Sequence, residues 1–142
     1  MKGENNVRHI SSTFIFVFNK DFSKILLIKR NEAKRIRWGF EWGIIGGKFE
    51  EGENEIQAGI REAKEEIGIN LKPKQLKVVF IKPIKDITHY FFAININENS
   101  KIKINNEADE YKWFSLHKLP KSMTDRPEDV IKAARIMSER YG

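Results

Sequence analysis

Several features are absent from this 142-residue sequence, and each absence narrows the chemistry open to the protein. It has no cysteine, which excludes disulfide bonds, thiol catalysis and a zinc site built on cysteine. Its longest hydrophobic run, residues 14–18, is far shorter than the roughly 20 residues that a helix needs to span a bilayer. Residues 1–6 are too polar for a secretion signal. We therefore expect a cytoplasmic protein with no membrane contact.

The overall composition is that of a small folded domain. There is no internal repeat, and a hydrophobic content of 40% is enough for one core at this length. We expect a single domain over residues 1–142, with residues 1–6 flexible. The formal net charge of +6 attracts anions, which favours nucleotides, polyphosphates or nucleic acid as partners. Charge alone does not decide between these partners, and the sequence does not predict the oligomeric state.

The hydrophobic pattern predicts several β-strands. Residues 9–18 and residues 24–29 are rich in β-branched and aromatic side chains, and the short turn between them predicts an antiparallel hairpin. Two further strands are predicted at residues 75–84 and residues 88–96. A short aromatic strand is predicted to begin near Tyr111.

Charged and aromatic residues follow the predicted hairpin. Residues 31–37 carry several cationic side chains, and we expect a loop there that either is a solvated face or clamps substrate phosphates. Trp38, Phe40 and Trp42 occupy alternate positions, which predicts an extended segment whose aromatic side chains pack into the core or close over a ligand. At the other end of the chain, a helix is predicted to begin with Asp125 as its N-cap.

The most informative segment is residues 47–69, GKFEEGENEIQAGIREAKEEIGI, which contains seven glutamates and one arginine. Its apolar residues recur at helical spacing and predict one packed helix face: Ile56, Ile60, Ala63 and Ile67. Three glutamates line up on another face of the same helix: Glu55, Glu62 and Glu66. Like charges at this spacing destabilise a helix, so we expect a cation beside them.

The side chains around this helix also indicate which cation is bound. Carboxylate oxygens without cysteine and with few histidines favour Mg²⁺ or Mn²⁺ over zinc. Arg61 can hold a neighbouring carboxylate such as Glu53 through two hydrogen bonds and so fix the approach of the loop. Just before the helix, Gly46 and Gly47 allow a tight turn and a close approach of the backbone to a ligand.

The spacing of the fixed residues, G-x5-E-x7-R-E-U-x-E-E-x-G-U with U apolar, resembles the Nudix box. The matching residues are Gly47, Glu53, Arg61, Glu62, Ala63, Glu65, Glu66, Gly68 and Ile69. This resemblance implies an α/β fold, namely an α/β/α sandwich with a mixed β-sheet. It also implies a Mg²⁺-dependent hydrolase, with Mn²⁺ as a possible substitute, that cleaves nucleoside diphosphates linked to another moiety.

The resemblance further implies roles for individual residues. Glu62, Glu65 and Glu66 are expected metal ligands, together with the carbonyl of Gly47. Glu53 binds metal through water or holds Arg61, which belongs to the same catalytic group.

Three carboxylates remain open as general base: Glu65, Glu62 and Glu107. Glu107 lies in an acidic loop, six residues before Trp113, where several Nudix subfamilies place an additional carboxylate, and Glu110 is the competing choice. We further expect Arg37, Trp38 and Lys48 to contact the substrate.

The resemblance leaves the substrate open. A nucleoside triphosphate or related nucleotide is the first expectation, and a dinucleoside polyphosphate or an RNA 5′ end is the alternative. A second kind of function is also open: the protein could be a non-catalytic module that senses nucleotides. A sensor, however, has no need for the complete set of carboxylates.

Overall fold

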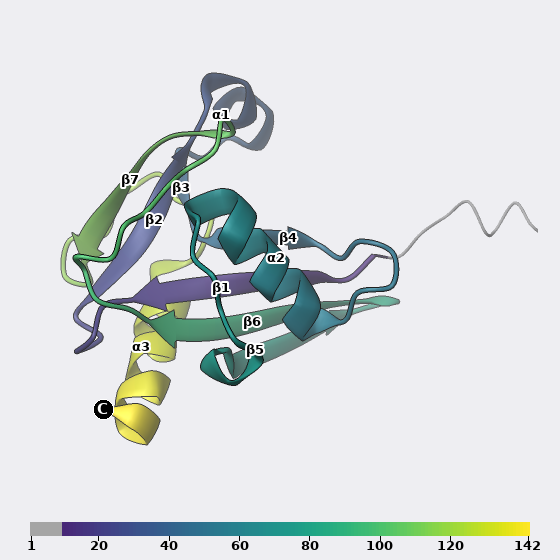
Figure 1. Ribbon diagram of the computed structural model, residues 1–142. Coiled ribbons are helices and arrows are strands. Elements are labelled where there is room, and N and C mark those ends of the chain that lie inside the picture. Colours follow the sequence, from purple (N-terminus) through teal and green to yellow (C-terminus); the bar gives the residue numbers. More distant parts are fainter. Residues whose placement is uncertain (1–9) are drawn as a thin grey trace, which may run out of the picture.

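The computed structural model describes residues 10–142, so the flexible segment expected at residues 1–6 lies outside the described part of the chain. Figure 1 shows its strands and helices, which are numbered in the order of the sequence. The strands are β1 (Ser12–Phe18), β2 (Lys24–Arg30), β3 (Trp42–Gly43), β4 (Ile45–Lys48), β5 (Lys77–Ile84), β6 (Ile87–Asn95) and β7 (Ala108–Ser115). The helices are α1 (Glu32–Trp38), α2 (Glu55–Ile67), the 3₁₀ helix η2 (Pro73–Gln75) and α3 (Pro127–Tyr141).

The seven strands form one mixed sheet around β1. The path β3-β2-β1-β6-β5 runs through it, with β4 paired to β1 and β7 paired to β2. β1 and β6 are parallel, whereas the other pairs are antiparallel, including the hairpin predicted for β1 and β2. One edge of β1 is shared: residues 12–15 pair with β4, and only Val17 and Phe18 pair with β2. β2 therefore diverges from β1 beyond Leu26.

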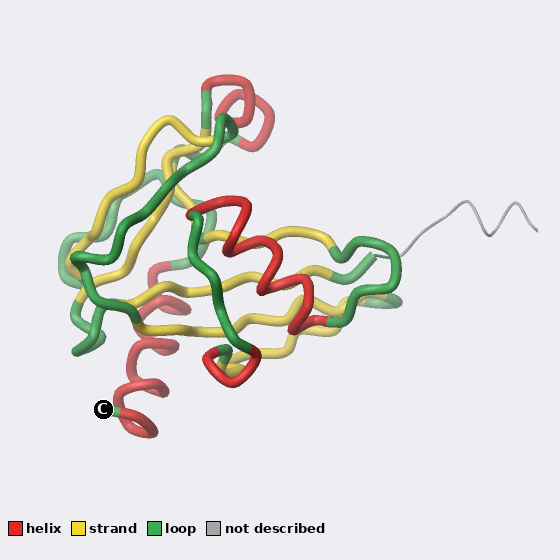
Figure 2. Tube along the Cα trace, viewed as in Figure 1, coloured by secondary structure: helices red, strands yellow, loops and turns green. Residues whose placement is uncertain are grey.

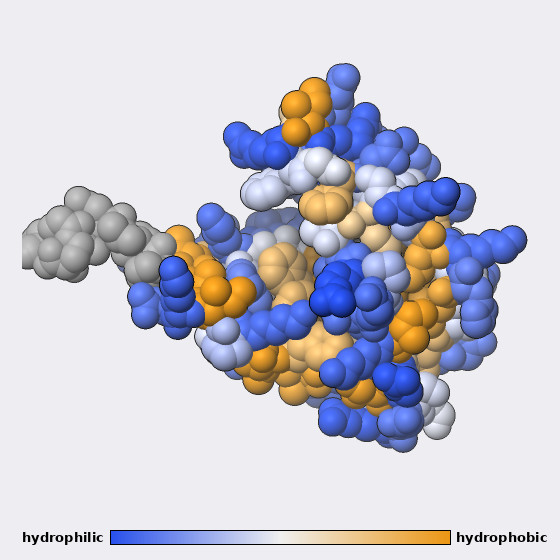
Figure 3. Space-filling model, turned by 180° about the vertical axis from the view of Figure 1, so that it is seen from behind, coloured by the Kyte–Doolittle hydropathy of each residue, from blue (hydrophilic) through white to orange (hydrophobic). Residues whose placement is uncertain are grey.

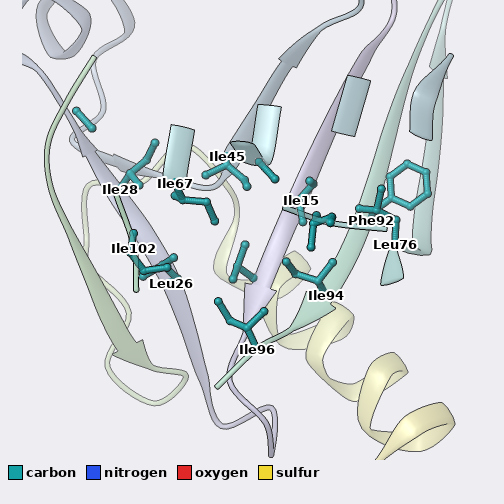
Figure 4. Packing of buried hydrophobic residues seen from close by; sticks show 14 residues of the cluster. Ile15, Leu26, Ile28, Ile45, Ile67, Leu76, Phe92, Ile94, Ile96 and Ile102 are labelled. Atoms are coloured by element: carbon teal, nitrogen blue, oxygen red, sulfur yellow. The ribbon is translucent and has the colours of Figure 1, made fainter. Parts of the chain in front are cut away.

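Helices α2 and α3 cover opposite faces of the sheet, with α2 in front of it and α3 behind it (Figures 1 and 2). Along β1, Ile15 and Val17 belong to the core under α2, whereas Phe16 and Phe18 belong to the core under α3. Figure 4 shows side chains of β1, β2, β6 and α2 converging in the first of these cores. The α/β/α sandwich expected from the sequence is confirmed.

Helix α2 has clear signals at both ends. Asn54 is the N-cap and forms a capping box with Gln57, and Gly68 ends the helix in the left-handed conformation at φ 71°. The predicted apolar face is confirmed, because Ala63 and Ile67 are buried and Ile56 packs against the same core.

The loop predicted at residues 31–37 is wrong, because these residues form helix α1. The side chain of Asn31 caps it by accepting a hydrogen bond from the backbone N–H of Lys34, and Gly39 ends it at φ 80°. α1 buries none of its residues, so its sequence lacks the apolar periodicity from which a helix is predicted.

Two neighbouring predictions also need correction. Trp38 ends α1 instead of lying in an extended segment, while Trp42 is buried and packs edge-on against Phe114 with 4.9 Å between ring centroids. Gly46 and Gly47 lie within strand β4, not in a tight turn.

The N-cap predicted for the last helix is also wrong. Arg126 occupies the N-cap position of α3 and makes no side-chain capping hydrogen bond, and Asp125 precedes it. Within residues 10–142, no helix is both long and apolar enough to cross a membrane.

Candidate functional site

The candidate site lies where α2 packs against β4. Glu66 faces inward from α2 and is only 6% exposed. Its Oε2 accepts a hydrogen bond from the backbone N–H of Gly46 at 3.1 Å, and its Oε1 lies 3.3 Å from Nη1 of Arg30. Arg30 also donates from Nη2 to the carbonyl of Ile44 at 2.9 Å. A buried carboxylate is thus tied to both the sheet and the connection between β3 and β4.

The glycine pair makes this close packing possible. Gly46 has φ 143°, and a Cβ at this position would overlap the carbonyl oxygen of Thr13. A Cβ on Gly47 would overlap the carboxylate of Glu62. The strand backbone at this pair therefore approaches Thr13 and Glu62 closely, and the expected approach to a ligand stays a prediction.

Glu62 and Glu66 carry carboxyl groups that interact directly. Burial raises the pKa of Glu66 well above its ordinary value of 4.5, and a hydrogen bond with Glu62 raises it further. The positive charge of Arg30 and the N–H of Gly46 oppose this shift in the pKa of Glu66. Two carboxyl groups in contact need either a shared proton or a cation between them, so this pair fits a positively charged ligand.

Arg61 connects the helix to the loop that precedes it. Its Nε donates to Oε2 of Glu53 at 2.7 Å, and its Nη2 donates to Oε1 of Glu53 at 3.0 Å and to the carbonyl of Lys48 at 3.0 Å. The predicted two-point contact with Glu53 is confirmed, and it lowers the pKa of Glu53. Arg61 Nη1 also lies 3.3 Å from Glu62 and 3.1 Å from Glu65. One guanidinium thus orders the carboxylates of the helix and the loop.

The candidate ligand atoms are carboxylate and carbonyl oxygens, which are the atoms that a hard divalent cation prefers. Among residues 10–142, however, no three acidic or histidine side chains converge as a metal cage. Glu62 and Glu66 meet, while Glu65 is half-exposed and paired with Arg61. Mg²⁺ commonly takes one or two carboxylates and completes its shell with water and substrate phosphates, which is compatible with this arrangement.

The acidic loop predicted to supply a further carboxylate lies against the end of α2. The side chain of Asn105 donates to the carbonyl of Glu65 at 3.0 Å, and the backbone N–H of Asn31 donates to the carbonyl of Glu107 at 2.9 Å. The Glu107 carboxylate lies 3.5 Å from Lys34, and that of Glu110 lies 3.7 Å from Lys29 on β2. The loop with Glu107 thus lies next to α2, whereas Glu110 lies in strand β7, which begins at Ala108 and not near Tyr111 as predicted. Both candidate carboxylates are exposed.

The three predicted substrate contacts are all exposed. Arg37 and Trp38 lie on α1, where Arg37 lines an open pocket of about 380 Å³ together with Lys34 and Glu107. Lys48 ends β4, and its carbonyl faces Arg61. Within the described residues, no hydrogen bond or ion pair joins Arg37 to the carboxylates of α2.

Sequence reasoning missed two residues of this region. Arg30, which directly precedes the cationic residues 31–37, is the partner of Glu66. Asp125 was interpreted as a helix cap, but its Oδ2 accepts a weak hydrogen bond from the backbone N–H of Ile44 at 3.4 Å. Burial raises the pKa of Asp125 above its ordinary value. No local motif signals either contact, because both join segments distant in sequence.

The fold thus places a helix rich in carboxylates against a glycine-containing strand of an α/β/α sandwich. The chain belongs to the Nudix family: the model of the NUDIX domain matches residues 8–134. Hydrolases of this family act on diphosphate linkages in nucleotide derivatives.

Two curated relatives illustrate the range of the family. The m7GpppN-mRNA hydrolase of Saccharomyces cerevisiae is 35% identical over 111 residues, which are 75% of this chain and 11% of the yeast protein. The ADP-ribose pyrophosphatase of Methanocaldococcus jannaschii is 34% identical over 120 residues, or 82% of this chain and 68% of that protein. The chain thus spans about a tenth of the yeast enzyme and about two thirds of the archaeal one.

Solved structures share the fold at low sequence identity. A MutT/nudix family protein from Enterococcus faecalis superposes with a TM-score of 0.71 at 20% identity, covering 94% of this chain and 63% of that chain. A MutT structure described for Aliivibrio salmonicida and Vibrio cholerae gives a TM-score of 0.69 at 24% identity, covering 94% and 100%.

Proposed function

We propose that this protein is a Mg²⁺-dependent hydrolase, with Mn²⁺ as a substitute, that cleaves the diphosphate linkage of a nucleoside triphosphate or related nucleotide. The observation that carries the proposal is the contact between the carboxyl groups of Glu62 and Glu66 beside the glycine pair of β4. A pair of acidic groups held together at such a position is costly without a cation.

The residues that would hold the metal are Glu62 and Glu66, together with Glu65 and the carbonyl of Gly47. When bound, the cation neutralises charge on the phosphoryl oxygens and aids in-line attack by water. Arg30 stabilises the ionised form of Glu66 and keeps its carboxylate in place.

The remaining residues orient the loop and accept the proton of the attacking water. Arg61 holds Glu53 and the carbonyl of Lys48, which fixes the loop that leads from β4 into α2. Glu65, Glu62 and Glu107 are the candidate bases. Exposure favours Glu65 and Glu107, because Glu62 is engaged with Glu66. Lys48, which is exposed at the end of β4, would contact a substrate phosphate.

A second candidate substrate is an RNA 5′ end. The relative from Saccharomyces cerevisiae is an m7GpppN-mRNA hydrolase, and the net charge of +6 suits a polyanionic substrate. Two further candidate substrates are a dinucleoside polyphosphate and ADP-ribose. The archaeal relative, an ADP-ribose pyrophosphatase, suggests the second of these. A non-catalytic sensor is the proposal from another class. The single domain and the cytoplasmic location expected from the sequence stay predictions.

The decisive experiment measures product release from a panel of these nucleotides and from 5′-triphosphorylated RNA, with Mg²⁺ and with EDTA. We expect hydrolysis of at least one substrate with Mg²⁺, none with EDTA, and recovery when Mg²⁺ or Mn²⁺ is restored. Calorimetric titration with Mg²⁺ and a non-hydrolysable nucleotide provides a readout independent of turnover. Nucleotide binding without hydrolysis at any metal concentration would favour the sensor and contradict the proposal.

A further inference from the structure

Helix α1 exposes large apolar side chains that no other described part of the chain covers. None of its seven residues is buried, and Ile36 is 78% and Trp38 61% exposed. Viewed from behind, hydrophobic atoms lie among strongly hydrophilic ones on the projection at the top, which is α1 (Figures 1 and 3). An exposed aromatic among cations is unusual for a surface that meets only water.

The cations and the aromatic ring share one side of α1. Lys34, Arg37 and Trp38 stand at positions i, i+3 and i+4, which lie together on a helix. Lys34 lies 3.5 Å from the carboxylate of Glu107, whereas the side chain of Arg37 makes no ion pair or hydrogen bond with the described residues. Lys34 and Arg37 line the pocket of about 380 Å³ next to Glu107, so this pocket holds two cations and one anion.

The structure holds α1 firmly in place. Arg35 lies 2.7 Å from Asp109 on β7, and the side chain of Asn31 donates to the carbonyl of Asn106 at 3.1 Å. Arg30, two residues before the helix, contacts Glu66 of the candidate hydrolytic site. The exposed side of α1 is therefore a positioned surface on the rim of that site.

We propose that the face formed by Lys34, Arg37 and Trp38 binds single-stranded nucleic acid, with a base stacked on Trp38 and a phosphate on Arg37. The inference rests on the second candidate of the proposed function, an RNA 5′ end, because it takes the bound strand to be the part of that substrate beyond the diphosphate. Base stacking on an exposed ring beside an unpaired guanidinium is how proteins hold single strands without reading sequence. The pocket of about 380 Å³ lies in the size range of sites for small ligands, about 300–1,000 Å³, and is lined by Lys34 and Arg37 but not by Trp38. The pocket would take the phosphate, with the base on the ring beside it.

Charge and shape favour a nucleic acid over an acidic peptide as the occupant. A flat ring next to a free cation matches the alternation of base and phosphate, whereas an acidic peptide would use the cations and leave Trp38 exposed. The chain as a whole is also basic, with a net charge of +6.

The test is binding of a fluorescent ten-nucleotide RNA with a 5′-monophosphate, measured by anisotropy on the full chain in EDTA. We expect Trp38→Ala and Arg37→Ala each to weaken binding about tenfold or more. In a plot of log affinity against log salt concentration, Arg37→Ala should reduce the slope by about 0.7, the value for one lost phosphate contact to a single strand. Bound RNA should also quench the fluorescence of the wild type more than that of Trp38→Ala. The same DNA sequence serves as a second probe.

Arg140→Ala and Tyr141→Ala are matched controls at the far end of the molecule, on α3, and should bind RNA as the wild type does. Equal losses in these controls would show general charge attraction and overturn the proposal. So would unchanged binding in Trp38→Ala. A third outcome would also overturn the proposal: the protein binds no RNA, sedimentation shows a dimer, and Trp38→Ala abolishes that dimer. The face would then bind a second copy of the chain. The probe contains no phosphoanhydride and the assay no metal, so the result is independent of whether α2 catalyses hydrolysis.

Discussion

Arg61 holds Glu53 at two points, with Nε 2.7 Å from Oε2 and Nη2 3.0 Å from Oε1. Both side chains are mostly shielded, at 19% and 16% exposure. The pair spans eight residues and ties the middle of α2 to the loop that enters it. A planar guanidinium can make this contact and a lysine ammonium cannot.

The first prediction concerns this geometry. Arg61→Lys keeps the positive charge but loses one of the two hydrogen bonds, so we expect turnover to fall at least about tenfold as the loop loses its position. The free energy of unfolding should fall by about 1 to 2 kcal/mol, which urea denaturation measures. Lys64→Ala, an exposed change in the same helix, is the control. A variant with native turnover would show that the contact is dispensable for catalysis.

The second prediction tests the buried carboxylate. Glu66→Gln keeps the shape of the side chain but removes the negative charge, so turnover with Mg²⁺ should fall at least about 100-fold. Steady-state rates at saturating nucleotide and Mg²⁺ measure the effect, and Glu51→Gln in the exposed loop is the control. Near-native rates in pure Glu66→Gln protein would mean that Glu66 is not a ligand.

The third prediction separates backbone strain from site geometry at adjacent glycines. Gly46→Ala forces a side chain into a φ of 143° and against the carbonyl of Thr13, so the free energy of unfolding should fall by about 1 to 3 kcal/mol. Gly47→Ala instead pushes the flexible carboxylate of Glu62 aside. This variant should keep its stability to within about 1 kcal/mol while turnover falls at least about tenfold. Thermal unfolding and kinetics on both variants distinguish the effects, and equal destabilisation would contradict this division.

The fourth prediction is a pH dependence at Asp125. Burial raises the pKa of this carboxyl above its ordinary value of 3.8, so the folded protein retains a proton that the unfolded chain has released. Its contribution to stability is therefore present below pH 3.8 and is lost as the pH rises through the folded-state pKa. We expect Asp125→Asn to be more stable than the wild type at pH 7, with the difference shrinking toward pH 4. Thermal unfolding across this range measures it, and a difference that grows on acidification would reverse the sign and refute the assignment.

The sequence predicted those parts of the structure that depend on local pattern. The apolar face of α2 was readable because a core imposes a helical period on the chain, and β1 was readable from its β-branched and aromatic residues. Helix α1 was not predicted, since it buries no residue and depends on the cap from Asn31 and the contact between Arg35 and Asp109. Contacts of this kind stabilise the helix without producing a periodic pattern of apolar residues in the sequence.

The site shows the same division. The contact between Arg61 and Glu53 was predicted because both residues lie within one short segment. The partner of Glu66 was not, because Arg30 is 36 positions away and reaches it only after β2 has turned from β1. Asp125 was misread because a carboxylate before a proline resembles a cap, whereas its distant neighbour, the backbone of Ile44, is visible only in the fold.

The divided edge of β1 holds two groups of elements on one strand. Strand β4 and helix α2 take their positions from the first half of β1, whereas β3, β7 and α1 are attached through β2. The two groups are also joined directly, because Arg30 at the end of β2 contacts Glu66 on α2. A shift of β2 relative to β1 would therefore also move the cationic partner of the buried carboxylate.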